Sequence, residues 1–194
     1  MTSSPHQQGL SIQRDAMRAE LSLALEDDDD PLAAYDNFVK WTLQNYANHS
    51  DSGLLELLEE TARIFKDDLR YMAGDLRYLK LWILFANHVK KPTAVYAYMW
   101  EKGIGKLYAL FFKEYAESLE REARYVLVSY RDNAVTLAAR LAEAETVITL
   151  GIRTRAKPLK RLQSFQNDFN ARRAAGMPLS AKAPPFRKVC CQYH

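Results

Sequence analysis

DLRYLKLWILFANHVKKP, residues 75–92, predicts an α-helix that carries more apolar surface than one packing partner needs. At 100° per residue, one apolar stripe of this helix contains Leu76, Leu79, Ile83 and Ala86. A second stripe, roughly a quarter-turn away, contains Tyr78, Trp82, Phe85 and Val89. We expect the first stripe to fill the core of a helical domain, which leaves the second stripe to contact something else.

Capping and breaking residues separate this helix from its neighbours. Asp75 is placed to cap the first turn, and Lys90-Lys91-Pro92 ends the helix and starts the next one. Gly103-Ile104-Gly105 predicts a helix end followed by a tight loop, because glycine adopts a positive φ. Residues 66–74 are predicted to be a polar linker. Other helices are predicted after Asp30-Pro31, after the loop 48–53, and at about 106–122, 133–155 and 157–173.

Helix pairs joined by short turns indicate an all-α repeat, because one pair cannot bury its apolar side alone. Ala144, Ile148 and Gly151 match the small-large-small core pattern in the second helix of a tetratricopeptide repeat, with Pro158 soon after. The last predicted helix has a regular apolar stripe made of Leu159, Leu162, Phe165 and Phe169. The other repeats are irregular, so we expect a short and divergent array.

Composition limits the class of protein. A chain of 194 residues with 48% hydrophobic and 26% charged residues is long enough for one ordinary core. No apolar run approaches the roughly 20 residues that span a bilayer, and the first residues lack the apolar region of a signal peptide. We therefore expect a reducing compartment, no membrane contact, and free thiols at the adjacent Cys190 and Cys191.

The net charge of +3 hides a gradient along the chain. Residues 1–30 contain two arginines and seven acids, whereas Lys and Arg gather after residue 152. A basic end can bind nucleic acid, and a helical repeat that binds nucleic acid through its basic C-terminal helices is our alternative function. The more common explanation is a solvated helix face with cations near helix C-termini.

The residue patterns of enzymes are missing. His6, His49, His88 and His194 have no metal-ligand spacing, and there is no Cys-x-x-Cys pair. No glycine-rich phosphate loop, nucleophile elbow or kinase signature is present. His88 is the only histidine in a strongly apolar helix, which alone is weak evidence for catalysis. We expect a protein that is not an enzyme and that uses no cofactor and no metal.

Four blocks in order resemble the N-terminal domain of mitotic-checkpoint proteins, namely the "budding uninhibited by benzimidazole" kinase and its mitotic-arrest-deficient relative. They are DPLAAYDNFVKWTLQNY from Asp30, DLRYLKLWI from Asp75, YAYMWEKGIGKLYALFFKEYAESLE from Tyr96 and AKPLKRLQSFQNDFNAR from Ala156. The resemblance covers about residues 30–172. It implies a short right-handed solenoid of about three tetratricopeptide-like helix pairs with flanking helices, without catalytic activity.

The resemblance also implies a function. It suggests a spindle-assembly-checkpoint protein, in the nucleus and at the kinetochore, that docks by binding a short amphipathic helix of the outer-kinetochore scaffold (blinkin-like) and that meets other checkpoint proteins. Nucleic acid is then an unlikely partner. Carried over by position, the residues that bind the partner peptide are Trp82, Phe85, His88, Val89 and, from the following helix, Tyr98.

The domain organisation expected from this resemblance has three parts. Residues 1–29 form an N-terminal extension that is partly helical or disordered, 30–173 form the tetratricopeptide-like domain, and 174–194 form a disordered tail. The segment 123–139 is longer than the connection found in the family, so we expect an insertion there. No Lys-Glu-Asn degron precedes the domain, which favours the kinase branch, and the C-terminal kinase domain of that branch is absent from these residues.

Overall fold

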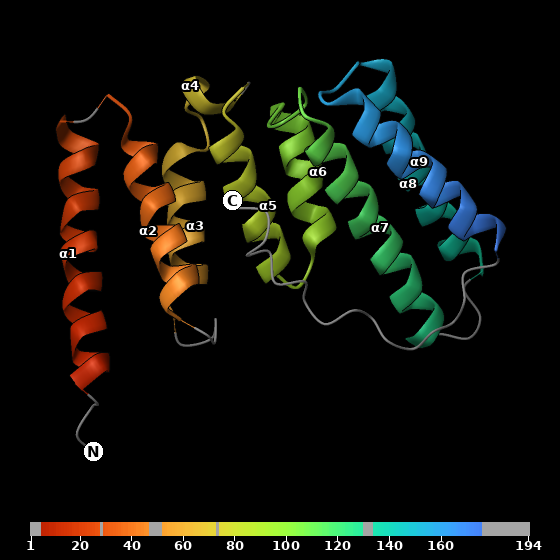
Figure 1. Cartoon of the computed structure of the whole chain (residues 1–194). Helices are drawn as coiled ribbons and strands as arrows, with labels where there is room; N and C mark the ends of the chain where they lie inside the picture. Colours follow the sequence, from red (N-terminus) through yellow and green to blue (C-terminus); the bar gives the residue numbers. More distant parts are fainter. Residues whose placement is uncertain (1–4, 28, 47–51, 73, 130–133, 176–194) are drawn as a thin grey trace. The chain divides into compact units, whose positions relative to one another are not determined.

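The computed structural model describes residues 5–27, 29–46, 52–72, 74–129 and 134–175, and their regular elements are all α-helices (Figure 1). The helices are α1 (Pro5–Asp27), α2 (Pro31–Asn45), α3 (Leu54–Phe65), α4 (Leu69–Met72), α5 (Leu76–His88), α6 (Pro92–Lys102), α7 (Ala109–Ser129), α8 (Ala134–Arg153) and α9 (Leu159–Ala174). They form two compact units, one of α1 to α3 up to Asp67 and one of α4 to α9 from Asp68. The predicted all-α class is confirmed.

In the first unit, α1 packs on α2 and α2 packs on α3. Apolar side chains at helical spacing on α2 and α3 are buried, with Leu32, Tyr35, Leu54 and Leu58 all at the core. The ring of Tyr35 meets the ring of Phe65 edge-on, with 5.2 Å between their centroids. Because one side of each helix is buried in this way, the 3.6-residue spacing of apolar residues was sufficient to predict both helices.

In the second unit, α5 begins and ends where the sequence predicts. The carboxylate of Asp75 accepts hydrogen bonds from the backbone N–H groups of Arg77 at 2.7 Å and Tyr78 at 3.4 Å. Burial raises the pKa of the Asp75 carboxyl. These hydrogen bonds and the Arg77 guanidinium lower it by more, so the pKa lies below its ordinary value. Pro92 is the first residue of α6, and Gly103 ends α6 with φ of 82°.

The predicted linker 66–74 contains one helical turn, α4, which the sequence did not indicate. Asp68 starts this turn, because its carboxylate accepts a hydrogen bond from the Arg70 N–H at 3.0 Å. The turn carries Tyr71 into the core, where its ring lies 6.2 Å from the ring of Tyr78. The cap at Asp68 and the burial of Tyr71 together explain why part of the polar linker is helical.

The pattern predicted on α8 packs as a tetratricopeptide core should. Ala144 and Ile148 are fully buried, and Gly151 lies where α8 meets α7 and α9. A Cβ atom on Gly151 would lie 2.5 Å from Cγ of Phe112 and 2.7 Å from Cδ2 of Leu162. Only glycine fits, because real Cβ atoms do not approach other atoms so closely.

We expect Gly151→Ala to lower the free energy of unfolding by about 1–3 kcal/mol, because the new methyl group must displace the ring of Phe112 and the side chain of Leu162. Urea denaturation measures the change. Gly9→Ala is the matched control, since Gly9 lies inside α1 with no atom within 4 Å of its ideal Cβ. The same substitution there should be neutral or stabilising by about 0.5–1 kcal/mol. Equal effects at the two sites would contradict the close packing of Gly151.

The domain boundaries stay predictions. α7 continues through the buried Ala123 to Ser129, and α8 starts at Ala134, so the expected insertion 123–139 would begin and end inside helices. Residues 130–133 of that segment, and 176–194 of the expected tail with both cysteines, lie outside the described residues. None of the described helices is long and apolar enough to cross a membrane.

Candidate functional site

The two stripes of α5 divide between core and surface differently from the prediction. Leu79, Ile83 and Ala86 of the first stripe are buried, as expected. Leu76 is 40% exposed, so its assignment to the core is wrong. Leu76 is the first residue of α5, directly after the capping Asp75. The buried part of the helix starts later along the chain, so this end of the stripe faces solvent.

The second stripe is partly core. Tyr78 is fully buried and Trp82 is only 6% exposed. The indole of Trp82 stacks on Tyr98 with 5.4 Å between ring centroids, and it meets the rings of Tyr78 and Phe85 edge-on at 6.1 and 6.0 Å. Its Nε1 atom is buried without a hydrogen-bond partner among the described residues. Trp82 therefore joins α5 to α6 from the inside and offers little surface to a ligand.

The other four predicted residues are partly exposed. Phe85, His88 and Val89 end α5, and Tyr98 lies on α6. The structure brings Phe85 and Tyr98 together through Trp82, because both rings contact the indole. The ring of His88 is fixed by a 2.8 Å hydrogen bond between Nδ1 and the carbonyl oxygen of Leu84. We name these four residues, Phe85, His88, Val89 and Tyr98, the α5–α6 surface.

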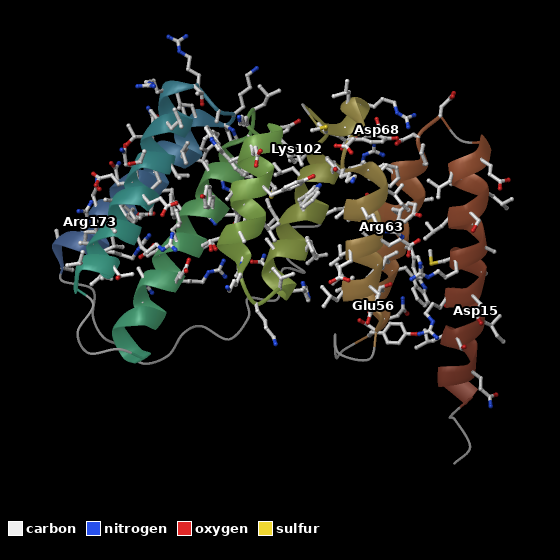
Figure 2. All side chains as sticks on the ribbon, turned by 180° about the vertical axis from the view of Figure 1, so that it is seen from behind. Asp15, Glu56, Arg63, Asp68, Lys102 and Arg173 are labelled. Carbon is white, nitrogen blue, oxygen red and sulfur yellow. The ribbon has the colours of Figure 1, made fainter. Side chains whose placement is uncertain are left out.

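Lysine side chains lie at both ends of the α5–α6 surface. Lys90 and Lys91, which the sequence analysis used only as a helix stop, are exposed directly after Val89. Lys102, labelled in Figure 2, lies in the last turn of α6, and its ammonium is 5.9 Å from the ring centroid of Tyr98. A partly exposed aromatic and aliphatic patch with basic ends can bind the apolar face of a helix that carries acids at its ends.

One buried aromatic residue of this region was missed by the sequence analysis. Tyr71 packs on Tyr78, which in turn contacts Trp82, so a chain of rings supports the α5–α6 surface from within. The available signal was the apolar set Leu69, Tyr71 and Met72 that follows the capping residue Asp68. No group of His, Cys, Asp or Glu able to hold a metal ion occurs in the described part of the chain.

Residues 12–129 match the family model for Mad3/BUB1 homology region 1. The chain belongs to this family. The resemblance noted from the four sequence blocks is thereby confirmed.

Similar members of the Mad3/BUB1 family come from distant organisms. The human mitotic checkpoint serine/threonine-protein kinase BUB1 beta is 28% identical over 163 residues, which are 84% of this chain and 14% of that protein. The Schizosaccharomyces pombe mitotic spindle checkpoint component mad3 is 28% identical over 164 residues, 83% of this chain and 47% of that protein. The chain thus spans about half or less of the length of these relatives.

Two solved structures resemble the fold. A chain in a crystal structure of a mitotic checkpoint complex has a TM-score of 0.74 and 26% identity, covering 94% of this chain and 77% of that chain. The crystal structure of the conserved N-terminal domain of BUB1 has a TM-score of 0.71 and 24% identity, covering 96% of this chain and 89% of that chain. The predicted tetratricopeptide-like fold class of the Mad3/BUB1 family is confirmed.

Proposed function

We propose that this chain is the protein-interaction domain of a mitotic spindle-checkpoint protein and docks it at the kinetochore by binding a short amphipathic helix of a blinkin-like scaffold. The observation that carries the proposal is the α5–α6 surface, where Phe85, Val89 and Tyr98 stay partly exposed above the buried Trp82. Membership of the Mad3/BUB1 family supports the checkpoint assignment. The function is affinity and placement, and no chemical step is needed.

The rigidity of the aromatic cluster favours binding. Phe85 and Tyr98 are held against the indole of Trp82, so little side-chain freedom remains to be lost when a partner helix covers them. Covering the exposed part of a phenylalanine removes apolar area from water at about 25 cal/mol per Å². Aromatic side chains on a preformed surface are typical hot spots of protein interfaces.

Charge narrows the class of partner. Lys90 and Lys91 follow the α5–α6 surface at one end and Lys102 adjoins Tyr98 at the other. We infer a partner helix with an apolar stripe and acidic residues near its ends. Contact with other checkpoint proteins belongs to the same proposal, supported by the likeness to a chain in a mitotic checkpoint complex. The location that follows is the nucleus, at the kinetochore.

Phe85→Ala should weaken binding to this partner by about 2 kcal/mol, or roughly 30-fold, because it removes an anchor while the indole beneath stays in place. The measurement is fluorescence anisotropy with labelled peptides that tile the blinkin-like scaffold of the same organism. A tagged Phe85→Ala protein should also fail to gather at kinetochores in cells arrested in mitosis.

Leu69→Ala is the control, since Leu69 lies in the same unit and is 82% exposed, on the separate short helix α4. It should bind the scaffold peptides as the unmodified protein does. Far-UV circular dichroism should be unchanged for both variants. If Phe85→Ala keeps full affinity for a scaffold peptide that binds the unmodified protein, the α5–α6 surface is not the docking site.

A further inference from the structure

Three turns at one end of the second unit are tied together by hydrogen bonds. The hydroxyl of Tyr108 donates to the carbonyl oxygen of Gly74 at 2.6 Å. The N–H of Lys157 donates to the carbonyl oxygen of Leu107 at 2.8 Å, and the N–H of Ala109 donates to that of Lys157 at 2.8 Å. The turns before α5, between α6 and α7, and between α8 and α9 therefore form one fixed surface (Figure 1).

An exposed leucine lies on this surface. Leu107 is 59% exposed, although it sits in a turn whose backbone is held on both sides. Its Cδ1 atom lies 4.0 Å from the position of a Cβ on Gly74, so the leucine rests against a residue with no side chain of its own. A single exposed leucine is common on protein surfaces, but here the fixed backbone holds it at one place beside the basic residues described next.

The same turns are strongly basic. Residues 146–167 contain five Lys or Arg and no Asp or Glu. Arg155 and Lys157 are exposed, and none of the ion pairs in the described part of the chain involves either of them. The acids on the nearby turn are already paired, Asp75 with Arg77 at 2.7 Å and Asp68 with Arg70 at 2.8 Å. Arg155 and Lys157 thus carry positive charge that no ion pair among the described residues neutralises.

The backbone of Arg155 adds an independent observation. Arg155 has φ of 57°, the left-handed conformation that glycine or asparagine adopts more readily. An arginine at this position is unfavourable for the backbone, and its exposed guanidinium makes no ion pair that would compensate. Its left-handed backbone closes the C-terminal cap of α8, where the N–H of Ala156 donates to the carbonyl oxygen of Gly151 at 3.0 Å, so arginine is tolerated there and not required by the fold.

We propose that Leu107, Arg155 and Lys157, which we name the cationic turn surface, bind an acidic segment of a partner protein that places an apolar side chain on Leu107. Charge complementarity carries the choice of partner. The chain's own residues 169–194 are excluded as the occupant because they contain no Asp or Glu. A nucleic acid would also satisfy the cations through its phosphates, so single-stranded RNA is a competing outcome of the test.

The cationic turn surface is separate from the α5–α6 surface. It lies where α5 begins and α6 ends, whereas Phe85, His88 and Val89 lie where α5 ends. Of the residues named at the α5–α6 surface, only Lys102 lies at the end of α6. The inference therefore goes beyond the proposed function, and the two can fail independently.

The test uses the full chain and a fluorescein-labelled dodecapeptide that repeats Asp-Glu-Leu, followed by anisotropy at low ionic strength. We expect binding that weakens as salt rises. Arg155→Gly should reduce affinity about threefold while leaving the melting temperature unchanged or higher, since glycine relieves the left-handed backbone. Arg155→Gly with Lys157→Glu should reduce affinity at least about tenfold. A merely structural Arg155 would instead lower the melting temperature and leave affinity unchanged.

Lys90→Glu with Lys91→Gln is the matched control, because it makes the same change of net charge at the other end of the unit. This control and Phe85→Ala should bind the probe as the unmodified protein does. Three results overturn the inference: no binding of the probe, equal losses in the turn variant and the control, or single-stranded RNA that binds more tightly and depends on the same residues. Loss only in the control or in Phe85→Ala would also overturn the inference, because the probe would then bind the α5–α6 surface, and the proposed function would stand.

Discussion

Trp82→Ala lowers the free energy of unfolding by about 3–5 kcal/mol, the range for deleting a large aromatic side chain from a core. The expectation follows from its burial and from its three ring contacts with Tyr78, Phe85 and Tyr98. Its loss leaves a cavity between α5 and α6 that the backbone of two helices cannot fill. Urea denaturation followed by circular dichroism measures the change, which is large compared with the total stability of most domains.

Two companion variants separate the role of Trp82 in the core from a role in binding. Phe85→Ala, whose ring is partly exposed, should cost only about 1 kcal/mol of stability and should mainly affect peptide binding. Trp82→Phe should retain much of the stability, because an aromatic ring still fills part of the space. If Trp82→Ala has the same free energy of unfolding as the unmodified protein but no longer binds the peptide, Trp82 is a surface anchor and its assignment to the core is wrong.

The local features of the fold could be predicted because they depend on residues close in sequence. Asp75 caps the helix whose N–H groups follow it, Pro92 starts α6, and Gly103 adopts the positive φ that ends it. The small residue at Gly151 was also predictable, since the tetratricopeptide pattern exists to let helices approach closely. In each case a few neighbouring residues contain the physical cause.

The division of α5 between core and surface could not be predicted in the same way. Helical spacing gives two stripes, but the packing of other elements decides which members are covered. Tyr78 is buried because α4 brings Tyr71 against it, and Trp82 because α6 brings Tyr98. Of the five residues predicted to bind a partner, Trp82 is thus almost absent from the surface, and the binding role of the other four stays a prediction.

Long-range polar contacts were also beyond sequence analysis, and one of them should dominate the stability of the α7–α9 packing. Glu120 on α7 is buried, and its carboxylate accepts hydrogen bonds from Arg172, 52 residues away, at 3.0 Å from Nε and 2.9 Å from the terminal nitrogen. Arg124 adds a third bond at 2.5 Å. Burial raises the pKa of Glu120, but the bonds from the two arginines outweigh burial and lower the pKa below its ordinary value of 4.5.

Replacing both Arg124 and Arg172 with Met should therefore lower the free energy of unfolding at neutral pH by about 3–5 kcal/mol. The reason is that a buried carboxylate without a partner is far less favourable than the same group in water. Methionine keeps the length and most of the apolar contact of each arginine stem, so the loss reports the charge. Urea denaturation at neutral pH gives the value.

The pH dependence should change sign between the two proteins. In the unmodified protein the folded pKa of Glu120 is lowered, so its contribution to stability is fully present above 4.5 and is lost as pH falls through the folded pKa. In the double variant burial acts alone and raises the folded pKa above 4.5. Its penalty is then present at neutral pH and is relieved as the pH falls. Between about pH 7 and about pH 5, the double variant should gain stability relative to the unmodified protein.

Adding Glu120→Met to the double variant provides the control. Without the carboxylate there is nothing left to ionise in the core, so the triple variant should recover most of the lost stability and lose the extra pH dependence. If the triple variant is as unstable as the double variant, the loss comes from disturbed packing of α9 on α7. The buried charge of Glu120 would then not be what holds these helices in register, and its lowered pKa would have no consequence for folding.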